Sequence, residues 1–303
     1  MPPRRLRLDA ELVRRGLARS REHAGELIAQ GLVAVDGGRA TKPATAVGVD
    51  AALVVRDDPD RPQYVSRGGH KLAGALAAFE PAGLRVAGRR VLDAGASTGG
   101  FTDVLLRHGA REVVAVDVGY GQLAWSLRSD PRVQVHDRTN VRELTPELVG
   151  GPVDLVVGDL SFISLALVLD PLIGVLRPDG DLVPMVKPQF EVGKERLGKG
   201  GVVRDPELRA EAVLRVAELA AERGWPARGV ATSPLPGPSG NVEFFLWLRR
   251  GREGIDPAAI RDEVRRPRAQ APAQAPAQAP SHAPAPAPTL APPLGEPDEK
   301  VGP

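Results

Sequence analysis

The central part of the chain alternates short apolar runs with segments of helical periodicity. The apolar runs lie at 91–92, 113–116, 133–135, 153–157 and 182–186. Short apolar runs bounded by turn residues are typical of buried strands, and strands that alternate with helices form parallel sheets. The pattern therefore predicts an α/β fold with a doubly wound, mainly parallel sheet.

The segment that follows these runs predicts how the sheet is completed. A long amphipathic helix is expected over 205–224, with Pro206 in its first turn. Two further strands are expected near 229–232 and 242–248, the second antiparallel at the edge of the sheet. Earlier in the domain, Tyr120–Leu123 is expected to open a helix.

The N-terminal part predicts a separate, small α+β module. A short helix is expected over 6–16, with Asp9 as its N-cap and Gly16 as its stop. A second short helix follows over 20–31, and Asp36-Gly37 is a pair typical of a hairpin turn. The sequence therefore predicts that this part of the chain forms two basic helices packed on a small sheet.

The changes in composition along the chain predict its division into domains. The prediction is an N-terminal domain over 1–60, a linker over 61–67, an α/β domain over 68–251 and a tail over 252–303. The tail is expected to be mostly disordered from residue 268, because its Ala/Pro-rich repeats offer too little apolar surface to offset the entropy of folding.

Composition excludes several classes of chemistry. The chain has no cysteine, so it has no disulfide, no thiolate metal site and no cysteine nucleophile. No stretch approaches the roughly 18 apolar residues of a membrane-spanning helix, and the Arg-rich N-terminus has no apolar signal region. No membrane association is expected, and the predicted compartment is the cytoplasm.

A glycine-rich turn between a strand and a helix predicts a cofactor site. The glycines of Asp93-x-Gly95-x-x-x-Gly99 do not have the dinucleotide spacing, which disfavours an NAD-dependent oxidoreductase. The arrangement instead resembles the first motif of methyltransferases that use S-adenosylmethionine (SAM). In that resemblance Asp117, at the end of the next strand, binds the ribose hydroxyls. The candidate cofactor-binding residues are Asp93, Gly95, Ser97, Thr98, Gly99, Gly100, Phe101 and Asp117, with Asp137 and Asn140 as candidates for the adenine or as ordinary turn residues.

Four charged residues are expected to meet at the carboxyl ends of the strands. Lys187 ends an apolar strand, where an unpaired ammonium is costly, and its expected partners are Asp159 and Glu243. Lys71 taken alone is more simply an exposed lysine. Together Lys71, Asp159, Lys187 and Glu243 resemble the catalytic tetrad of ribose 2′-O-methyltransferases of the RrmJ/FtsJ-like class, which needs no metal. Lys187 would either accept the hydroxyl proton or only position the hydroxyl, and the sequence leaves both roles open.

The basic cluster at the N-terminus predicts binding to RNA. The candidate residues are Arg4, Arg5, Arg7, Arg14, Arg15, Arg19 and Arg21. A charged solvated surface would explain the cluster equally well on its own. However, the surrounding pattern from Leu8 to Gly37 resembles the S4 RNA-binding domain, whose basic helices contact phosphates and RNA shape.

Longer strings identify the chain as similar to the TlyA family. These strings are 66–72, 93–101, 117–123, 159–164, 186–191 and 233–243. The resemblance implies a SAM-dependent (cytidine-2′-O)-methyltransferase of 16S and 23S rRNA that acts on ribosomal subunits and is linked to capreomycin susceptibility. Because the family also carries the name haemolysin, a membrane-active protein is one alternative, and a non-catalytic ribosome-binding or assembly factor is another.

Overall fold

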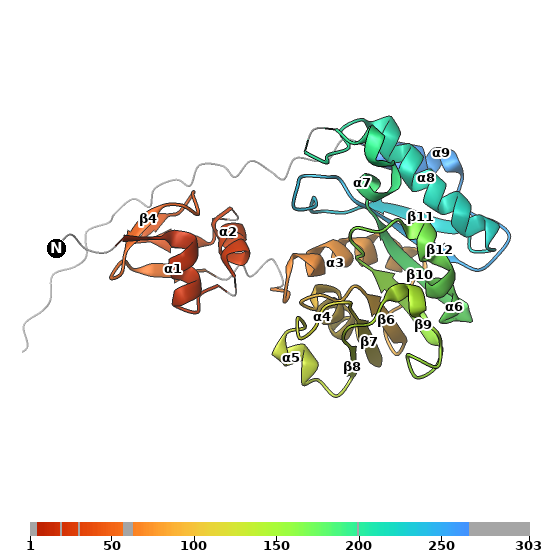
Figure 1. The fold of residues 1–303 in the computed structure, drawn as a ribbon, viewed down its shortest axis with the longest axis horizontal. Helices are drawn as coiled ribbons and strands as arrows, with labels where there is room; N and C mark the ends of the chain where they lie inside the picture. The colour runs from red at the N-terminus through yellow and green to blue at the C-terminus, as the bar shows by residue number, and fades with distance from the viewer. Residues whose placement is uncertain (1–4, 19, 30, 57–62, 199, 267–303) are drawn as a thin grey trace, which may run out of the picture. The chain divides into compact units, whose positions relative to one another are not determined.

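The structure is a computed structural model, which describes residues 5–18, 20–29, 31–56, 63–198 and 200–266 (Figure 1). The predicted tail over 268–303, residues 61–62 of the predicted linker, and the candidates Arg4 and Arg19 lie outside these residues.

The N-terminal module is built from two short helices and two small antiparallel sheets. Its elements are β1 (Arg5–Arg7), α1 (Leu8–Arg14), α2 (Arg21–Ala29), β2 (Val33–Val35), β3 (Gly38–Arg39), β4 (Ala46–Gly48) and β5 (Leu53–Val55). β1 pairs with β4, and β2 pairs with both β3 and β5. The buried side chains of Leu8, Leu12, Ile28 and Val33 belong to one apolar cluster. This cluster is the apolar core of the module.

The turns of this module follow the sequence pattern, and one helix cap does not. Asp36 and Gly37 both have positive φ, of 48° and 81°, as the predicted hairpin turn requires. Gly16 has a φ of 72° just after α1 and ends the helix as predicted. The prediction of Asp9 as N-cap was wrong: Arg7 occupies that position, because the Asp9 carboxylate lies inside the first turn and binds arginine side chains.

A seven-stranded sheet forms the centre of the second domain. Its strands are β6 (Arg90–Ala94), β7 (Glu112–Val116), β8 (Val133–His136), β9 (Val153–Gly158), β10 (Leu176–Val186), β11 (Ala227–Thr232) and β12 (Phe244–Arg249). The spatial order is β11-β12-β10-β9-β6-β7-β8, with parallel pairing from β10 through β8. The mainly parallel, doubly wound fold is thus confirmed. The order reverses between β6 and β9, where ligands bind in such sheets.

The last two strands correct one detail of the prediction. β12 is antiparallel to β10, as expected, but it does not form the edge of the sheet. β11 pairs antiparallel with the outer side of β12 and forms the edge instead. The order of strands depends on a non-local pairing, which periodicity along the chain does not encode.

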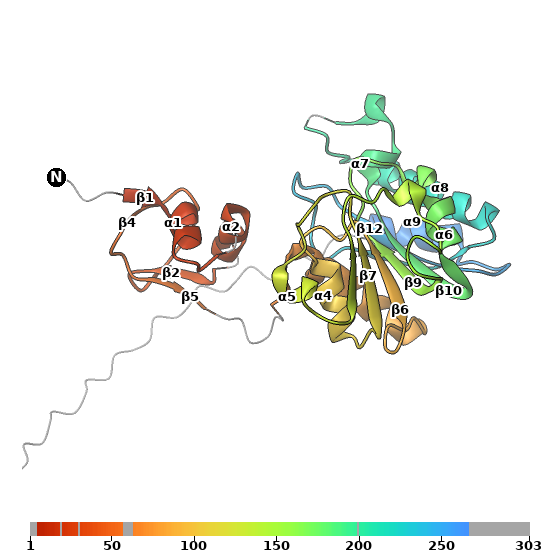
Figure 2. The ribbon, with the colours of Figure 1, turned by 60° about the horizontal axis from the view of Figure 1, so that its bottom comes forward.

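Helices cover both faces of the sheet (Figures 1 and 2). The helical segments are α3 (Arg67–Phe79), η1 (Glu80–Ala82), α4 (Gly100–Arg107), α5 (Trp125–Arg128), η2 (Val141–Glu143), η3 (Leu165–Leu167), α6 (Leu169–Gly174), α7 (Pro188–Glu191), η4 (Lys194–Arg196), α8 (Pro206–Glu222) and α9 (Pro257–Arg265). α3 and α4 pack on one face of the sheet, and α6, α8 and α9 pack on the other. Successive strand residues point to opposite faces, so Val91 belongs to the apolar cluster under α3 and α4 and Leu92 to the cluster under α6, α8 and α9.

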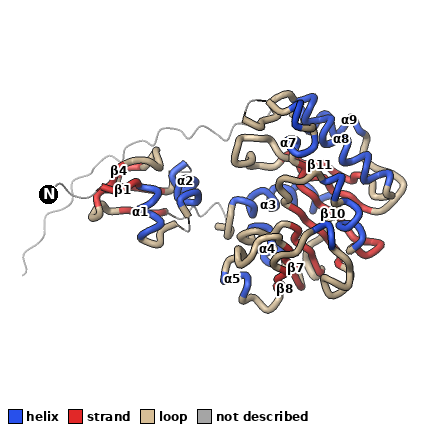
Figure 3. The backbone as a smooth tube through the Cα atoms, viewed as in Figure 1, coloured by secondary structure: helices blue, strands red, loops and turns tan. Residues whose placement is uncertain are grey.

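The predicted helix at Tyr120–Leu123 is absent, and this prediction was wrong (Figure 3). Helix α5 begins only at Trp125. The backbone N–H groups of Gly119 and Gly121 donate to the carboxylates of Asp117 and Asp137. Gly121 also has a φ of 65°, so the segment forms a turn held by acidic side chains rather than a helix.

Candidate active site

The register of the sheet brings the ends of four strands together. Ala94 is paired with both Val116 and Gly158, so β6, β7 and β9 end at one level. Val186 at the end of β10 is paired with Phe244 at the start of β12. The residues that follow or precede these positions are therefore held at one edge of the sheet by backbone pairing. This edge carries the predicted site.

Lys187 is buried and has two polar partners. It is 7% exposed and directly follows β10. Its Nζ lies 2.6 Å from Asp159 Oδ1 and donates a hydrogen bond of 2.7 Å to Ser161 Oγ. The predicted pairing with Asp159 is therefore present. Ser161 was not predicted as a partner, although it lies in the same string of sequence as Asp159.

Lys71 forms the second ion pair. Its Nζ lies 2.6 Å from Glu243 Oε2, and the two residues are 6% and 1% exposed. The simple expectation of an exposed lysine was wrong, because α3 packs with this face against the sheet. Glu243 also differs from the prediction, because it is the partner of Lys71 rather than of Lys187. The four residues thus form two pairs of opposite charge, and the burial of Lys71, Lys187 and Glu243 strengthens the attractions.

The glycine-rich loop between β6 and α4 has the conformation that its sequence requires. Gly95 and Gly99 have φ values of 83° and 97°, and Ser97 has a φ of 48° despite its side chain. A Cβ atom at Gly95 would lie 2.8 Å from the carbonyl oxygen of Asp159. The loop therefore passes close to the start of the segment after β9, which a larger residue would prevent. A pocket of about 100 Å³ lies here, lined by Ser66, Gly68, Gly95, Ala96, Ser97, Thr98, Gly100, Phe101 and Asp159.

Asp117 is fixed by the backbone around it. Its two carboxylate oxygens accept hydrogen bonds from the N–H groups of Ser97, at 2.8 Å, and Gly119, at 2.7 Å. A carboxylate oxygen can accept more than one hydrogen bond, so both oxygens retain capacity for a ligand. The hydrogen bond from Ser97 to Asp117 also ties the end of β7 to the glycine-rich loop.

Asp93 is fully buried, and only one of its two carboxylate oxygens has a hydrogen-bond partner among the described residues. Thr102 Oγ1 donates to its Oδ2 at 2.7 Å, while Oδ1 has no hydrogen-bond partner among the described residues. Burial raises the pKa of the Asp93 carboxyl to about 7, against the smaller opposing effect of the Thr102 hydrogen bond. A buried acceptor without a partner is costly and is concentrated at functional sites. Thr102 was not among the predicted residues.

The two candidates for the adenine have partners within the protein. Arg128 donates to the carboxylate of Asp137 and holds its pKa below the usual value. The Asn140 side chain accepts from the N–H group of Arg142 and caps the short helix η2. These contacts are those of ordinary turn residues, and contact with adenine stays a prediction.

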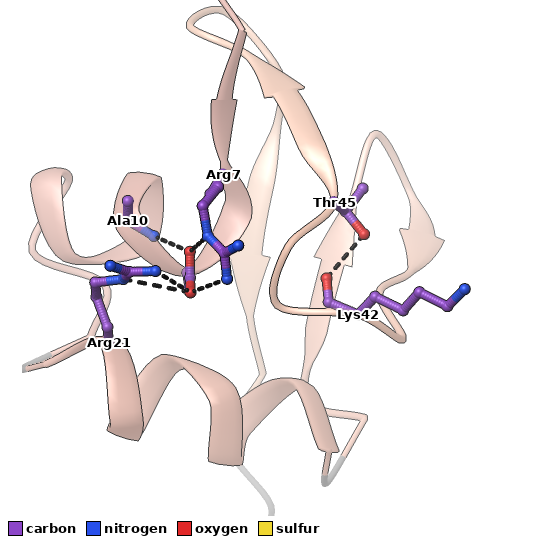
Figure 4. A network of polar contacts seen from close by, with 6 residues as sticks. Arg7, Ala10, Arg21, Lys42 and Thr45 are labelled. Carbon is purple, nitrogen blue, oxygen red and sulfur yellow. Dashed lines mark hydrogen bonds and ion pairs between the residues drawn. The ribbon is translucent and has the colours of Figure 1, made fainter.

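The arginines of the N-terminal module converge on two buried acids. Arg7 and Arg21 bind the carboxylate of Asp9, as Figure 4 shows for the two guanidinium groups. Arg14 and Arg15 bind Glu11, at 2.6 and 2.7 Å. These ion pairs hold the pKa of both acids well below their usual values.

Most of these arginines stay accessible despite these pairs, but Arg15 is only 23% exposed and also donates to the carbonyl groups of Val49 and Ala51. The side chains of Arg7, Arg14 and Arg21 are 51%, 56% and 60% exposed, and Arg5 on β1 is exposed as well. The buried acids therefore orient the guanidinium groups on the surface of the module while leaving them open to solvent.

Comparisons with known proteins agree with the fold and the site. Residues 64–250 match the FtsJ-like methyltransferase family, and residues 6–53 match the S4 domain. The 16S/23S rRNA (cytidine-2′-O)-methyltransferase TlyA of Mycobacterium tuberculosis is 63% identical over 270 residues, which are 89% of this chain and 99% of that protein. Hemolysin A of Brachyspira hyodysenteriae is 35% identical over 242 residues, 79% of this chain and 98% of that protein. A solved structure of a hemolysin candidate from Streptococcus thermophilus is 38% identical, covers 86% of this chain and 94% of its own, and has a TM-score of 0.68.

The sheet, its glycine-rich loop and the paired charges at the strand ends define an FtsJ-like methyltransferase, here joined to an S4 domain. More narrowly, the chain belongs to the TlyA family, with the identity and coverage given above. No helix within the described ranges has the length and apolar character needed to cross a membrane.

Proposed function

We propose that this chain transfers a methyl group from SAM to the ribose 2′-hydroxyl of cytidine in 16S and 23S rRNA. The observation that carries the proposal is the presence of two ion pairs, the buried Lys71–Glu243 and the partly buried Lys187–Asp159, at the carboxyl ends of the strands beside the glycine-rich loop. The name of the relative from Mycobacterium tuberculosis supports the substrate.

The residues around the glycine-rich loop fit SAM. Asp117 has remaining acceptor capacity on both oxygens, which suits the two hydroxyls of a ribose. The loop 95–100 brings backbone close to a ligand and leads into the start of α4, where the helix dipole favours an anionic group such as a carboxylate. Asp93 Oδ1 is a buried acceptor that lacks a donor among the described residues. When bound, SAM supplies a methyl group that its positively charged sulfur makes electrophilic.

Lys187 is the residue that we assign to the ribose hydroxyl. A hydroxyl is a poor nucleophile, so the enzyme must hold its oxygen in line with the methyl group and help it lose its proton. Lys187 Nζ donates one hydrogen bond, to Ser161, and forms an ion pair with Asp159, so the nitrogen retains bonding capacity for the substrate oxygen. Lys71 and Glu243 form the second ion pair, which carries no net charge.

The N-terminal module is assigned to the recognition of ribosomal RNA. Its exposed arginines are held in fixed directions by buried acids, which lowers the entropy that a contact with phosphate would cost. An S4 domain of this kind fits structured RNA in ribosomal subunits. Since the substrate is ribosomal RNA, the reaction takes place in the cytoplasm.

The cofactor assignment is tested by binding alone. Asp117→Ala is expected to weaken SAM binding roughly 10- to 100-fold in calorimetry, because it removes a charged acceptor. Asp130→Ala is the matched control, since the carboxylate of Asp130 binds the nearby Arg132 in a surface turn. Equal SAM affinity in the wild type and Asp117→Ala would contradict the assignment.

The reaction itself is tested by the identity of the product. Purified ribosomal subunits that lack the modification are incubated with labelled SAM, and the rRNA is digested to nucleosides for mass spectrometry. We expect 2′-O-methylcytidine from both subunits. A base-methylated nucleoside would overturn the proposal, and tight subunit binding without methyl transfer would favour the assembly-factor alternative.

The proposal extends to antibiotic susceptibility. Restoring this gene to a bacterium that lacks the modification should change the minimum inhibitory concentration of capreomycin. An unchanged value despite full rRNA methylation would contradict this extension. A liposome-leakage assay on the pure protein tests the membrane-active alternative, for which we expect no leakage.

A further inference from the structure

We infer that Ser161 and Glu191 are positioning residues of the methyl-transfer site. Ser161 fixes the direction of Lys187 Nζ, and Glu191 fixes the loop that carries Ser161. This inference rests on the proposed methyl transfer and adds two residues to it. The loop concerned, residues 159–165, is called the serine loop below.

Ser161 determines where the free position of Lys187 Nζ points. The nitrogen contacts Asp159 Oδ1 at 2.6 Å and Ser161 Oγ at 2.7 Å. The bonds of this nitrogen are tetrahedral, so two fixed partners restrict the remaining directions. A charged lysine can present a proton in one of these directions, and a neutral lysine that donates to Ser161 can present its lone pair. In either protonation state, Ser161 orients the position that meets the substrate hydroxyl.

The serine loop is not a conformation that the chain adopts freely. Phe162, next to Ser161, has a φ of 64°, which is rare for a residue with a side chain. Phe162 is 91% exposed, so little burial compensates for this strain. Strained backbone of this kind persists only where the surroundings hold it.

Glu191 provides that hold from the end of α7. Its Oε2 accepts a hydrogen bond of 2.6 Å from Ser164 Oγ, and its Oε1 accepts one of 2.8 Å from the N–H group of Leu165. Glu191 is 6% exposed, and burial raises the pKa of its carboxyl. A carboxyl group is costly to bury, and here both of its oxygens are used to fix the serine loop.

The short helix α7 connects the two roles. Lys187 precedes its first residue and Glu191 is its last, so one helical turn carries both the lysine and the acid. The ring of Phe190 on this helix also lies 5.4 Å from the ring of Phe162, centroid to centroid. The serine loop is therefore attached to α7 at both ends of its strained part. A change at Glu191 reaches Lys187 through Ser161.

The test compares single variants in methyl transfer to ribosomal subunits. Ser161→Ala should lower kcat roughly 10- to 100-fold, because it removes a hydrogen bond to a charged group. The KM for subunits and the affinity for SAM should stay within about threefold of the wild type. Glu191→Ala should lower kcat about 10-fold in the same way, while Glu191→Gln should restore most of it, since an amide can still bond both Leu165 N–H and Ser164 Oγ.

A double variant separates positioning from a general loss of structure. If Glu191 acts through Ser161, the variant Ser161→Ala/Glu191→Ala loses no more kcat than Ser161→Ala alone. Asp181→Asn is the matched control for Glu191, because Asp181 is a fully buried, hydrogen-bonded acid on β10 that is paired with Leu155, away from the carboxyl ends of the strands where Lys187 lies. Ser129→Ala is the control for Ser161. Both controls should keep the wild-type kcat at a temperature where they are folded.

If Glu191→Ala does not fold, Ser164→Ala removes the same contact from the other side. The inference is overturned if the wild type produces 2′-O-methylcytidine and Ser161→Ala has the wild-type kcat. It is also overturned, for Glu191, if the losses of the two single variants multiply in the double variant. A wild-type protein that makes no 2′-O-methylcytidine would instead refute the proposed function, so the two failures are distinguishable.

Discussion

The buried Asp93 carboxyl should make the protein less stable as pH rises. Burial raises its pKa from the ordinary 3.8 to about 7 in the folded state. The folded protein then holds the proton more tightly than the unfolded chain, so the free energy of unfolding falls as pH rises from about 4 to about 7. The full shift corresponds to on the order of 4 kcal/mol above pH 7.

The substitution Asp93→Asn should remove this dependence, because the amide has nearly the same shape and does not ionise. Between pH 5 and pH 8, the wild type should lose roughly 3 kcal/mol more stability than Asp93→Asn does. The measurement is urea unfolding of both proteins, without SAM, at several pH values in this range.

A matched control is Asp170→Asn. Arg223 holds the pKa of the Asp170 carboxyl below its usual value, so Asp170 stays ionised throughout this range. The stability difference between this variant and the wild type should therefore not depend on pH. Parallel curves for the wild type and Asp93→Asn would refute the reasoning, because they would mean that Asp93 is ionised at a normal pKa.

Two further predictions concern the other charged groups. Lys71→Met should reduce stability in urea unfolding by about 3–5 kcal/mol, because it leaves the Glu243 carboxylate buried without its partner. The double variant Lys71→Met/Glu243→Gln should recover part of this loss. A loss of stability as large in the double variant would contradict this explanation. Arg14→Gln should reduce the slope of log affinity for ribosomal subunits against log salt concentration by about one, without affecting SAM binding. The control is Arg265→Gln, on α9. An unchanged slope for Arg14→Gln would remove Arg14 from the RNA-binding surface.

The sequence was sufficient for the fold because each strand has a strong local signal. Runs such as 153–157 are short, apolar and followed by a polar residue, so their ends were predicted within a few residues. The turn at 119–121 failed because its structure depends on the carboxylates of Asp117 and Asp137, which compete with a helix for the backbone donors. The prediction that the strand at 242–248 forms the edge of the sheet was wrong, because the order of strands depends on pairing between segments that are distant in the sequence.

The sequence indicated which charged residues form ion pairs at the strand ends, but not each of the pairings. The sequence placed Lys187 and Asp159 at the ends of parallel strands and Glu243 at the start of an antiparallel strand, and this arrangement brings all three to one edge of the sheet. The pairing of acids with lysines depends on how α3 packs against the sheet. Lys71 is buried on that helix and pairs with Glu243. The contribution of Ser161 depends on the path of a strained loop, for which the sequence has no periodic signal.

The central claim is that Lys187 serves the ribose hydroxyl at the methyl-transfer site. The most direct measurement is single-turnover transfer from labelled SAM to unmodified ribosomal subunits by the wild type and Lys187→Ala, with binding of SAM and of subunits measured for both. The account predicts that Lys187→Ala binds both ligands and forms no detectable 2′-O-methylcytidine. Substantial formation of 2′-O-methylcytidine by Lys187→Ala would contradict it.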